Sequence, residues 1–325
     1  MAKPAAPQPA DDRPRIGVSA CLLGQPVRFD GGHKRDDFLL GSFARFVEWV
    51  PVCPEVELGL GTPRETLRLE RHPDGLRLVM KKSGRDETAA MRAWAARRAR
   101  ALEGEGLSGY VLKKDSPSCG MERVKVYEGP GAPTRSGRGL FAEALMERLP
   151  LLPVEEEGRL SDPRLRENFI ERVFAYRRLQ SFLAGRFSLG GLVAFHSAHK
   201  LQLMAHSPEL YRSLGRLVAQ ARQLERARLR ADYERGFMQA LAALATPRRQ
   251  VNVLQHMLGY VSDRLGSGER AELLEVIEDY RGGLVPLVVP LTLLRHHVRR
   301  LEVGYLAGQT YLQPHPKELM LRNHV

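Results

Sequence analysis

Cysteine is scarce in this sequence, and long apolar runs are missing. Three cysteines in 325 residues are too few for a disulfide framework, so we expect an intracellular, cytoplasmic protein. The most apolar run, residues 284–294, contains two prolines and is shorter than the roughly 20 residues that a membrane span needs. The first 15 residues have no apolar core, which predicts neither a signal peptide nor a transit peptide.

Acidic residues are the minority among the charged side chains. The chain has 50 Lys+Arg against 38 Asp+Glu, a formal net charge of +12. In residues 151–325 arginine supplies 23 of the 25 basic side chains. Arginine pairs with phosphate and stacks on bases, which favours an RNA partner. A GC-rich genome that encodes arginine in place of lysine explains the same bias, because charge alone selects no partner.

The first half of the chain has the pattern of an α/β domain. Residues 1–14, rich in proline and alanine, are predicted to be a disordered tail. In residues 15–157 short apolar runs alternate with helical patterns, which indicates a Rossmann-like domain with a mostly parallel sheet. Strands are expected at residues 15–22, 49–53, 66–69, 76–81, 109–112, 124–127 and 151–154, and helices at 36–47, 86–102 and 139–148. The sequence Pro73-Asp74-Gly75 predicts a hairpin turn between the third and fourth strands.

The strand pattern stops near residue 158. Asp162 followed by Pro163 predicts the start of a helix, and helical patterns continue to about residue 312. We therefore expect an all-α domain over residues 158–325, following the α/β domain. Two domains agree with the length of the chain.

The three cysteines share a context rather than a local motif. Cys21, Cys53 and Cys119 are 32 and 66 residues apart, but each lies at or after the carboxyl end of a predicted strand and begins or ends a turn. The carboxyl ends of parallel strands share one edge of a sheet, where ligand sites of open α/β folds are built. Three isolated thiols are the alternative, since free cysteine is often buried. Converging thiolates would suit a [4Fe–4S] cluster with one open iron, whereas catalytic zinc more often uses histidine or carboxylate ligands.

Four ordered motifs surround these cysteines. They read SACLLG (19–24), RFDGGHKRD (28–36), CPEVELGLGTPRE (53–65) and KKDSPSCG (113–120). Together they resemble the thiouracil desulfidase (TudS) domain. LVAFHSAHKLQLMAHSPELYRSLGRLVA (192–219) looks like the helical, YbgA-like domain that is found fused to TudS domains. The pair resembles the RudS-type tRNA 4-thiouridine desulfidases over nearly the whole chain.

The resemblance implies both a cofactor and a reaction. It implies a [4Fe–4S] cluster held by Cys21, Cys53 and Cys119, with the fourth iron free to take sulfur. Glu55 matches the catalytic glutamate of the family and Ser116 its catalytic serine. Replacing sulfur by water at a ring carbon changes no oxidation state, so the expected enzyme is a non-redox desulfidase that cleaves the C–S bond hydrolytically.

Several residues have a second interpretation. Glu55 is two residues from Cys53 and suits a general base, but it would also cap a helix or pair with Arg64. Arg64 is predicted to bind a substrate oxygen or phosphate. Asp30 and Gly31 are candidate substrate contacts, with a plain turn as the alternative.

The two serines of the last motif leave a further choice open. Ser116 would alternatively serve only to form the turn, and Ser118 is the other candidate for the contact with the substrate.

The second domain offers basic surfaces and a histidine cluster. Arg226, Arg230 and Arg235, with Arg299 further along, are predicted to bind the tRNA backbone. A solvated helix face is the alternative. A metal site is conceivable at His196, His199 and His206, although contacts with core residues or RNA are favoured there.

The leading hypothesis is an enzyme that converts 4-thiouridine in tRNA to uridine and releases sulfide. Free substrates do not require a long arginine-rich appendix, which favours tRNA as the partner, with small thionucleosides as minor substrates. A desulfidase of free thiouracil or thionucleosides is one alternative. A non-catalytic Fe–S protein that binds tRNA is another.

Overall fold

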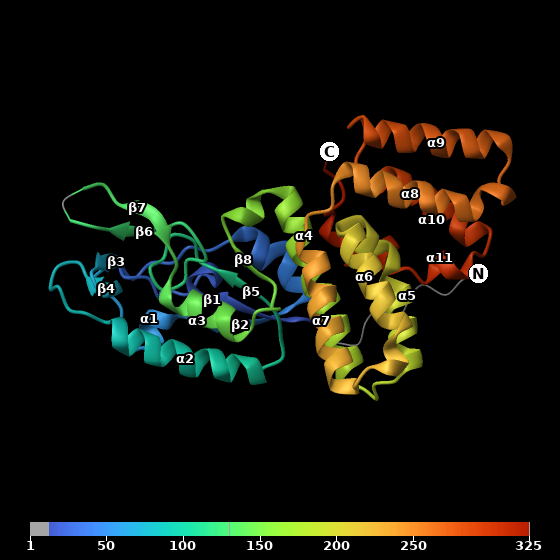
Figure 1. Ribbon diagram of the computed structural model, residues 1–325. Coiled ribbons are helices and arrows are strands. Elements are labelled where there is room, and N and C mark those ends of the chain that lie inside the picture. Colours follow the sequence, from blue (N-terminus) through green and yellow to red (C-terminus); the bar gives the residue numbers. More distant parts are fainter. Residues whose placement is uncertain (1–12, 130, 325) are drawn as a thin grey trace. The chain divides into compact units, whose positions relative to one another are not determined.

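The chain forms two compact units, which divide between Ser161 and Asp162. The computed structural model describes residues 13–129 and 131–324, so residues 1–12 of the predicted tail lie outside the described residues. Pro14, at the end of that tail, is buried, and its carbonyl accepts a hydrogen bond of 2.9 Å from the Glu48 amide. As expected, the first unit is an α/β domain with a parallel sheet, and helices make up the second (Figure 1).

A four-stranded parallel sheet forms the centre of the first unit. Its order is β2-β1-β5-β8, and all neighbouring strands run in the same direction. The strands are β1 (Arg15–Ser19), β2 (Glu48–Val52), β5 (Leu107–Leu112) and β8 (Val154–Glu156). Because they are parallel, the loops that follow them gather at one edge.

Three helices accompany this sheet, α1 (Pro54–Glu57), α2 (Thr88–Gly104) and α3 (Leu140–Arg148). Helices α2 and α3 pack against each other (Figure 1). The rings of Trp94 and Tyr110 lie 5.4 and 5.8 Å from the ring of Phe141, so an aromatic cluster joins both helices to β5. A Cβ on Gly17 would stand 2.1 Å from the Tyr110 ring, so only glycine fits on β1 beside this cluster.

A second sheet, not foreseen as separate, has the order β4-β3-β6-β7. Its strands are β3 (Leu67–His72), β4 (Gly75–Met80), β6 (Val124–Tyr127) and β7 (Thr134–Gly137). Strands β3 and β4 form the predicted hairpin. This second sheet is mostly antiparallel, since only its β3–β6 pair is parallel. Strand β7 escaped prediction because its sequence, TRSG, is polar and largely exposed.

Three predicted elements differ in detail. The first strand ends at Ser19, and a short 3-10 helix over Ala20–Leu23 follows it. The helix expected at 36–47 is an irregular segment, in which a π-helix over Leu39–Phe43 passes into a 3-10 helix over Ala44–Phe46. The last strand is Val154–Glu156 rather than 151–154.

The last strand is displaced because its acidic residues are buried and satisfied. Glu155 pairs with Arg159 at 2.6 Å, and Glu157, directly after the strand, pairs with Lys113 at 2.7 Å. These carboxylates belong to the first unit.

Helices make up the second unit. They are α4 (Pro163–Ala184), α5 (Leu189–His206), α6 (Pro208–Ala219), α7 (Arg226–Ala242), α8 (Pro247–Val261), α9 (Ser267–Arg281), α10 (Val288–Arg300) and α11 (Gly304–Ala307). The predicted start of α4 is confirmed, since the Asp162 carboxylate accepts from the Arg164 and Leu165 amides. Leucines and valines of α8, α9 and α10 form a large apolar core with Tyr311.

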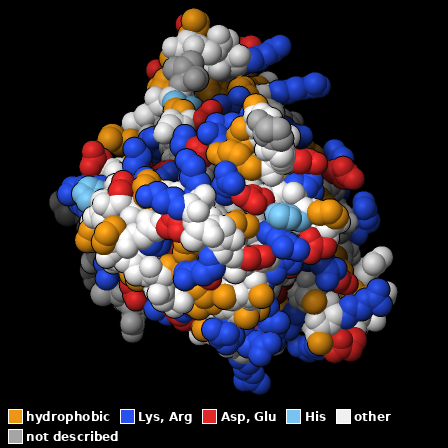
Figure 2. Space-filling model, turned by 90° about the vertical axis from the view of Figure 1, so that its left-hand side faces the viewer, with side chains coloured by type: hydrophobic (Ala, Val, Ile, Leu, Met, Phe, Trp, Pro, Cys, Tyr) orange, Lys and Arg blue, Asp and Glu red, His pale blue; other side chains and the backbone are white. Residues whose placement is uncertain are grey.

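The surface is charged and mixed. Figure 2 shows Lys and Arg side chains interspersed with Asp and Glu across the face that it presents. In the described part of the chain, no helix combines the length and the apolar character needed to cross a membrane.

Candidate active site

The three cysteines lie at the carboxyl edge of the parallel sheet. Cys21 lies in the 3-10 helix directly after β1, Cys53 lies between β2 and α1, and Cys119 lies in the loop that follows β5. The predicted placement of each cysteine after a strand is therefore confirmed. Strands β2, β1 and β5 are neighbours in the sheet, which brings thiols that are remote in sequence to one edge.

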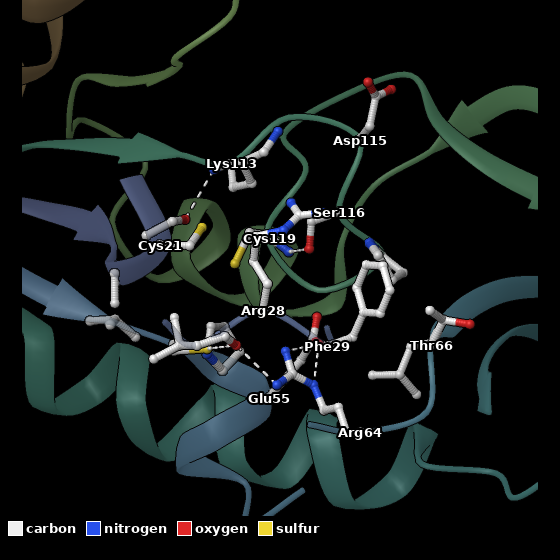
Figure 3. Close-up of a pocket in the computed structure, with 18 of the residues that line it drawn as sticks. Cys21, Arg28, Phe29, Glu55, Arg64, Thr66, Lys113, Asp115, Ser116 and Cys119 are labelled. Carbon is white, nitrogen blue, oxygen red and sulfur yellow. Dashed lines mark hydrogen bonds and ion pairs between the residues drawn. The ribbon is translucent and has the colours of Figure 1, made fainter. Parts of the chain in front are cut away.

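A cavity of about 320 Å³ opens at this edge. It is lined by all three cysteines and by Glu55, Arg64 and Ser116, among other residues. Figure 3 shows the sulfur atoms of Cys21 and Cys119 facing the same space. The volume is in the range of small-ligand pockets, about 300–1,000 Å³. The structure thus brings together in one cavity both catalytic candidates and all three candidate metal ligands.

Both oxygens of the Glu55 carboxylate are held by neighbours. Arg64 donates to Oε2 from Nε at 2.8 Å and from Nη2 at 2.5 Å, and the Ser118 hydroxyl donates to Oε1. Arg64 also donates to the Val27 carbonyl at 2.9 Å. The side chains of Glu55 and Arg64 are 15% and 5% exposed, so the carboxylate is fixed in one orientation. Arg64 is committed to Glu55, which was the alternative interpretation from the sequence.

The two serines hold different positions. Ser116 lines the cavity, whereas Ser118 is fully buried. Their hydroxyl oxygens are 3.2 Å apart, and the Cys119 amide donates to Ser116 Oγ at 3.1 Å. A chain of hydroxyl groups therefore runs from the cavity surface through Ser118 to Glu55.

The start of α3 fixes this loop. The amides of Phe141 and Ala142 donate to the Ser118 carbonyl at 3.0 and 3.2 Å. A Cβ on Gly139 would lie 2.4 Å from the same carbonyl oxygen, so glycine is required where the loop meets the helix.

The surroundings of the thiols disfavour their ionisation. Burial, followed by the nearby Cys53, raises the pKa of Cys21 to about 11. Burial is also the main cause that raises the pKa of Cys53 and of Cys119, and Cys119 is raised further by the other two cysteines. The three sulfurs are therefore close enough to influence one another. A bound metal centre would remove this penalty, because its positive charge deprotonates coordinating thiols.

The donor set fits a cluster better than a single ion. In residues 13–129 and 131–324, no three His, Cys, Asp or Glu side chains converge as ligands of one metal ion. Three thiols that line one cavity without meeting at a point suit a group with several irons, in which each thiolate binds its own iron. The same finding overturns the metal site at His196, His199 and His206. There, His196 lies 3.3 Å from the Tyr233 hydroxyl, and His206 lies 2.6 Å from the Ala243 carbonyl.

Asp30 and Gly31 lie outside the cavity lining. The exposed Asp30 carboxylate accepts from the Gly32 amide at 3.0 Å and faces Arg28 at 3.6 Å. Gly31 adopts φ 79°, a left-handed conformation that glycine tolerates. Asp30 and Gly31 therefore form a plain turn, which was their alternative interpretation from the sequence.

Sequence reasoning overlooked the two residues before that turn. Arg28 and Phe29 both line the cavity, with the guanidinium 5.4 Å from the ring centroid, and Phe29 is 38% exposed. They belong to the same RFDGG motif as Asp30 and Gly31. An aromatic residue beside an arginine, directly before the turn, was the available signal.

The predicted tRNA-binding arginines are exposed but do not form one face. Arg226, Arg230 and Arg235 lie on α7, and Arg299 lies on α10. Nine residues are about two and a half turns, so Arg235 and Arg226 lie on opposite sides of α7. Arg230 donates to the Leu183 carbonyl at 2.8 Å, and Arg235 pairs with Asp232 at 3.4 Å.

A second polar cluster is buried in the helical unit. Glu171 pairs with His206 at 3.4 Å and with Arg322 at 3.8 Å, and Arg322 pairs with Glu167 at 3.0 Å. Burial raises the pKa of Glu171, but His206 and Arg322 outweigh burial, so the net shift is downward. Burial lowers the pKa of His206, and the Glu171 carboxylate reverses this to a net rise. These shifts describe a paired structural network.

Comparisons with known proteins agree with the site. Residues 16–157 match the family model described as 2-thiouracil desulfurase, and residues 200–316 match the one described as a protein of unknown function, DUF1722. The first unit belongs to the 2-thiouracil desulfurase family and the second to the DUF1722 family. The expected likeness to thiouracil desulfidases and to YbgA is thereby confirmed at the level of these families.

Each of the individual relatives covers less than half of the chain. "Uncharacterized protein YbgA" of Escherichia coli (strain K12) is 33% identical over 164 residues, which is 49% of this chain and 95% of that protein. "Uncharacterized protein YbbK" of Bacillus subtilis (strain 168) is 31% identical over 138 residues, which is 41% of this chain and 89% of that protein. A solved [4Fe-4S]-dependent thiouracil desulfidase, TudS, is 34% identical, with a TM-score of 0.38 over 46% of this chain and 94% of its own.

Proposed function

We propose that this protein removes sulfur from 4-thiouridine in tRNA, with a [4Fe–4S] cluster as cofactor. One observation carries the proposal: three thiols from three adjacent strand ends line a cavity that also contains a fixed carboxylate and a serine hydroxyl. The desulfurase family of the first domain supports the same chemistry. The net reaction is thiocarbonyl plus water to carbonyl plus hydrogen sulfide, which needs no oxidant or reductant.

Cys21, Cys53 and Cys119 would hold the cluster. When bound, the cluster offers an iron without a protein ligand, a soft Lewis acid for sulfur. The protein supplies the walls of the site and the groups that handle protons.

Glu55 is the proposed general base. Arg64 and Ser118 orient its carboxylate, and a carboxylate with about four lone-pair positions can still accept a proton from water. Arg64 is therefore a positioning residue in this proposal, rather than the substrate contact that the sequence suggested.

Ser116 is the proposed substrate contact of the serine pair. It lines the cavity, and its hydroxyl leads through Ser118 to Glu55, so the two hydroxyls can pass a proton between substrate and base. Ser118 belongs to the relay behind the cavity wall.

Phe29 is the proposed platform for the pyrimidine ring. Its side chain is half-exposed at the cavity, and a flat apolar ring offers a stacking surface to a base. Arg28 beside it carries a positive charge that would favour the phosphate of a nucleotide.

The helical unit favours tRNA over a free base as the substrate. Arginine dominates its basic residues, and Arg226, Arg230, Arg235 and Arg299 are all exposed. A free base requires no such surface, whereas a tRNA backbone is bound through one. A tRNA substrate would place the reaction in the cytoplasm.

Sulfide release by anaerobically purified, iron-loaded protein tests the proposal. We expect the highest kcat/KM with thiolated tRNA, and lower values with 4-thiouridine monophosphate and free 4-thiouracil. Equal kcat/KM for all three would favour a desulfidase of small molecules. Tight tRNA binding without sulfide release from any of them would favour a non-catalytic Fe–S protein.

A further inference from the structure

The helical unit contains an open groove that none of the predicted arginines lines. It has a volume of about 510 Å³ and lies between α5 and α6, which pack against each other (Figure 1). Its lining combines basic, aromatic and small residues: His196, Ser197, Lys200, Tyr211, Arg212, Gly215, Arg216 and Ala219. No acidic residue is among them, so the groove is an electropositive concavity.

The groove contains three cations, Lys200, Arg212 and Arg216. Among the described residues, no hydrogen bond or ion pair engages the side chain of any of them. Both arginines are exposed on α6. Arg230 and Arg235 on α7, in contrast, already bind protein groups. The groove therefore offers cations that are free to meet an anionic ligand.

Aromatic rings adjoin the groove. Tyr211 lies parallel to His196, with an interplanar angle of 6°. Beyond it, the rings of Tyr260 and Tyr305 lie 5.0 Å apart and are 42% and 37% exposed. Gln309, four residues after Tyr305, donates to the carbonyl of Ser197 at 2.8 Å, and Ser197 lines the groove. Helix α8, which carries Tyr260, packs against α5.

Gly215 keeps the groove open. It lies inside α6, where glycine destabilises a helix relative to alanine. A Cβ there would have His196 Nε2 as its nearest neighbour, at 4.0 Å, so packing within the protein does not require glycine. The absent side chain leaves room for a ligand to approach the helix backbone.

We propose that this groove and the tyrosine pair bind unpaired nucleotides of RNA. Lys200, Arg212 and Arg216 would contact phosphates, and Tyr260 and Tyr305 would stack on bases. Exposed rings beside free cations are the combination that binds single strands, since bases in a duplex are stacked on one another and hidden from side chains. The assignment of RNA as the ligand rests on the proposed tRNA substrate.

Fluorescence anisotropy with a labelled oligouridylate of about 10 nucleotides tests the proposal, beside an RNA duplex hairpin and an oligoglutamate peptide. The wild-type protein should bind the single strand more tightly than either of the others. Tyr260→Ala and Tyr305→Ala should each weaken binding of the single strand by about 5-fold to 100-fold. Tyr260→Phe and Tyr305→Phe should retain binding, because they keep the rings.

The paired change Arg212→Ala and Arg216→Ala should reduce the salt dependence of binding. The slope of log K against log salt should fall by about 1.4, which corresponds to two phosphate contacts on a single strand. Arg248→Ala is the matched control, since Arg248 lies on α8 about 18 Å along the helix from Tyr260. Leu274→Ala controls for the loss of an apolar side chain, because Leu274 is 42% exposed.

Sulfide release from free 4-thiouridine by the same variants separates this proposal from the proposed function. Unchanged turnover with weakened RNA binding supports the groove as an RNA site. Binding of the single strand through the groove by a protein that does not desulfurate tRNA would still support it, while refuting the proposed function. Unchanged RNA binding in the alanine variants would overturn the groove as an RNA site. So would an equal loss of RNA binding in the controls Arg248→Ala and Leu274→Ala, or binding of oligoglutamate as tight as that of the single strand.

Discussion

The two buried polar clusters of this protein differ in how their charges are balanced. In the helical unit, Glu167 and Glu171 balance the charges of His206 and Arg322. At the sheet edge, three thiols line one cavity with pKa values raised chiefly by burial, and the Glu55 network opens onto the same cavity. Paired charges form a structural network, whereas groups with perturbed pKa values beside a cavity indicate a binding or catalytic site.

Of all the changes that test this comparison, removal of a thiol at the sheet edge should have the largest effect. Cys21→Ala, Cys53→Ala and Cys119→Ala should each lose bound iron and sulfide release together, because two thiolates hold a cluster poorly. Iron content, visible absorbance and sulfide release measure this, with circular dichroism to confirm folding. A fully active variant without iron would refute the cluster.

Removing the fixed carboxylate should separate chemistry from assembly. Glu55→Gln should keep the iron and lower kcat by about 10²–10⁴-fold, which is the usual contribution of a general base. Glu48→Gln is the control, since Glu48 is exposed on β2 and pairs with Arg15. Near-wild-type turnover of Glu55→Gln would exclude Glu55 from catalysis.

Breaking the balanced network should affect stability alone. Glu171→Gln leaves the buried His206 without its carboxylate and Arg322 with Glu167 alone, which should cost about 3–5 kcal/mol of unfolding free energy. Chemical denaturation measures the loss, and the exposed Glu275→Gln serves as control. Turnover of free 4-thiouridine should be unchanged, and a large loss of turnover would show that the network also serves the active site.

The pH dependence of stability should show whether Glu171 and His206 act through their charges. The pKa of Glu171 is lowered, so its contribution is present above the unfolded value near 4.5 and is lost as the pH falls through the folded value. The pKa of His206 is raised, so its contribution is present below 6.5 and is lost as the pH rises through the folded value. The difference in Tm between wild type and Glu171→Gln should therefore be largest between about pH 4.5 and 6.5. A difference that is constant with pH would mean that the pair does not act through charge.

Much of the fold could be predicted from local patterns. The hairpin turn at Pro73–Gly75, the cap at Asp162 and the position of each cysteine after a strand depend on neighbouring residues, and the structure confirms them. The last strand could not be placed, because its carboxylates are satisfied by partners remote in sequence, such as Lys113 for Glu157. Strand β7 has no apolar alternation to reveal it.

The sequence by itself determined the two-domain plan, the residue types of the site and their family, since motifs and periodicity are local properties. Tertiary structure alone decided that Arg64 is bound to Glu55, that Ser116 rather than Ser118 lines the cavity, and that the free cations lie on α5 and α6. Which groups face a cavity and which face each other depends on the order of strands and the packing of helices. Those contacts join residues far apart in the chain, and no local pattern records them.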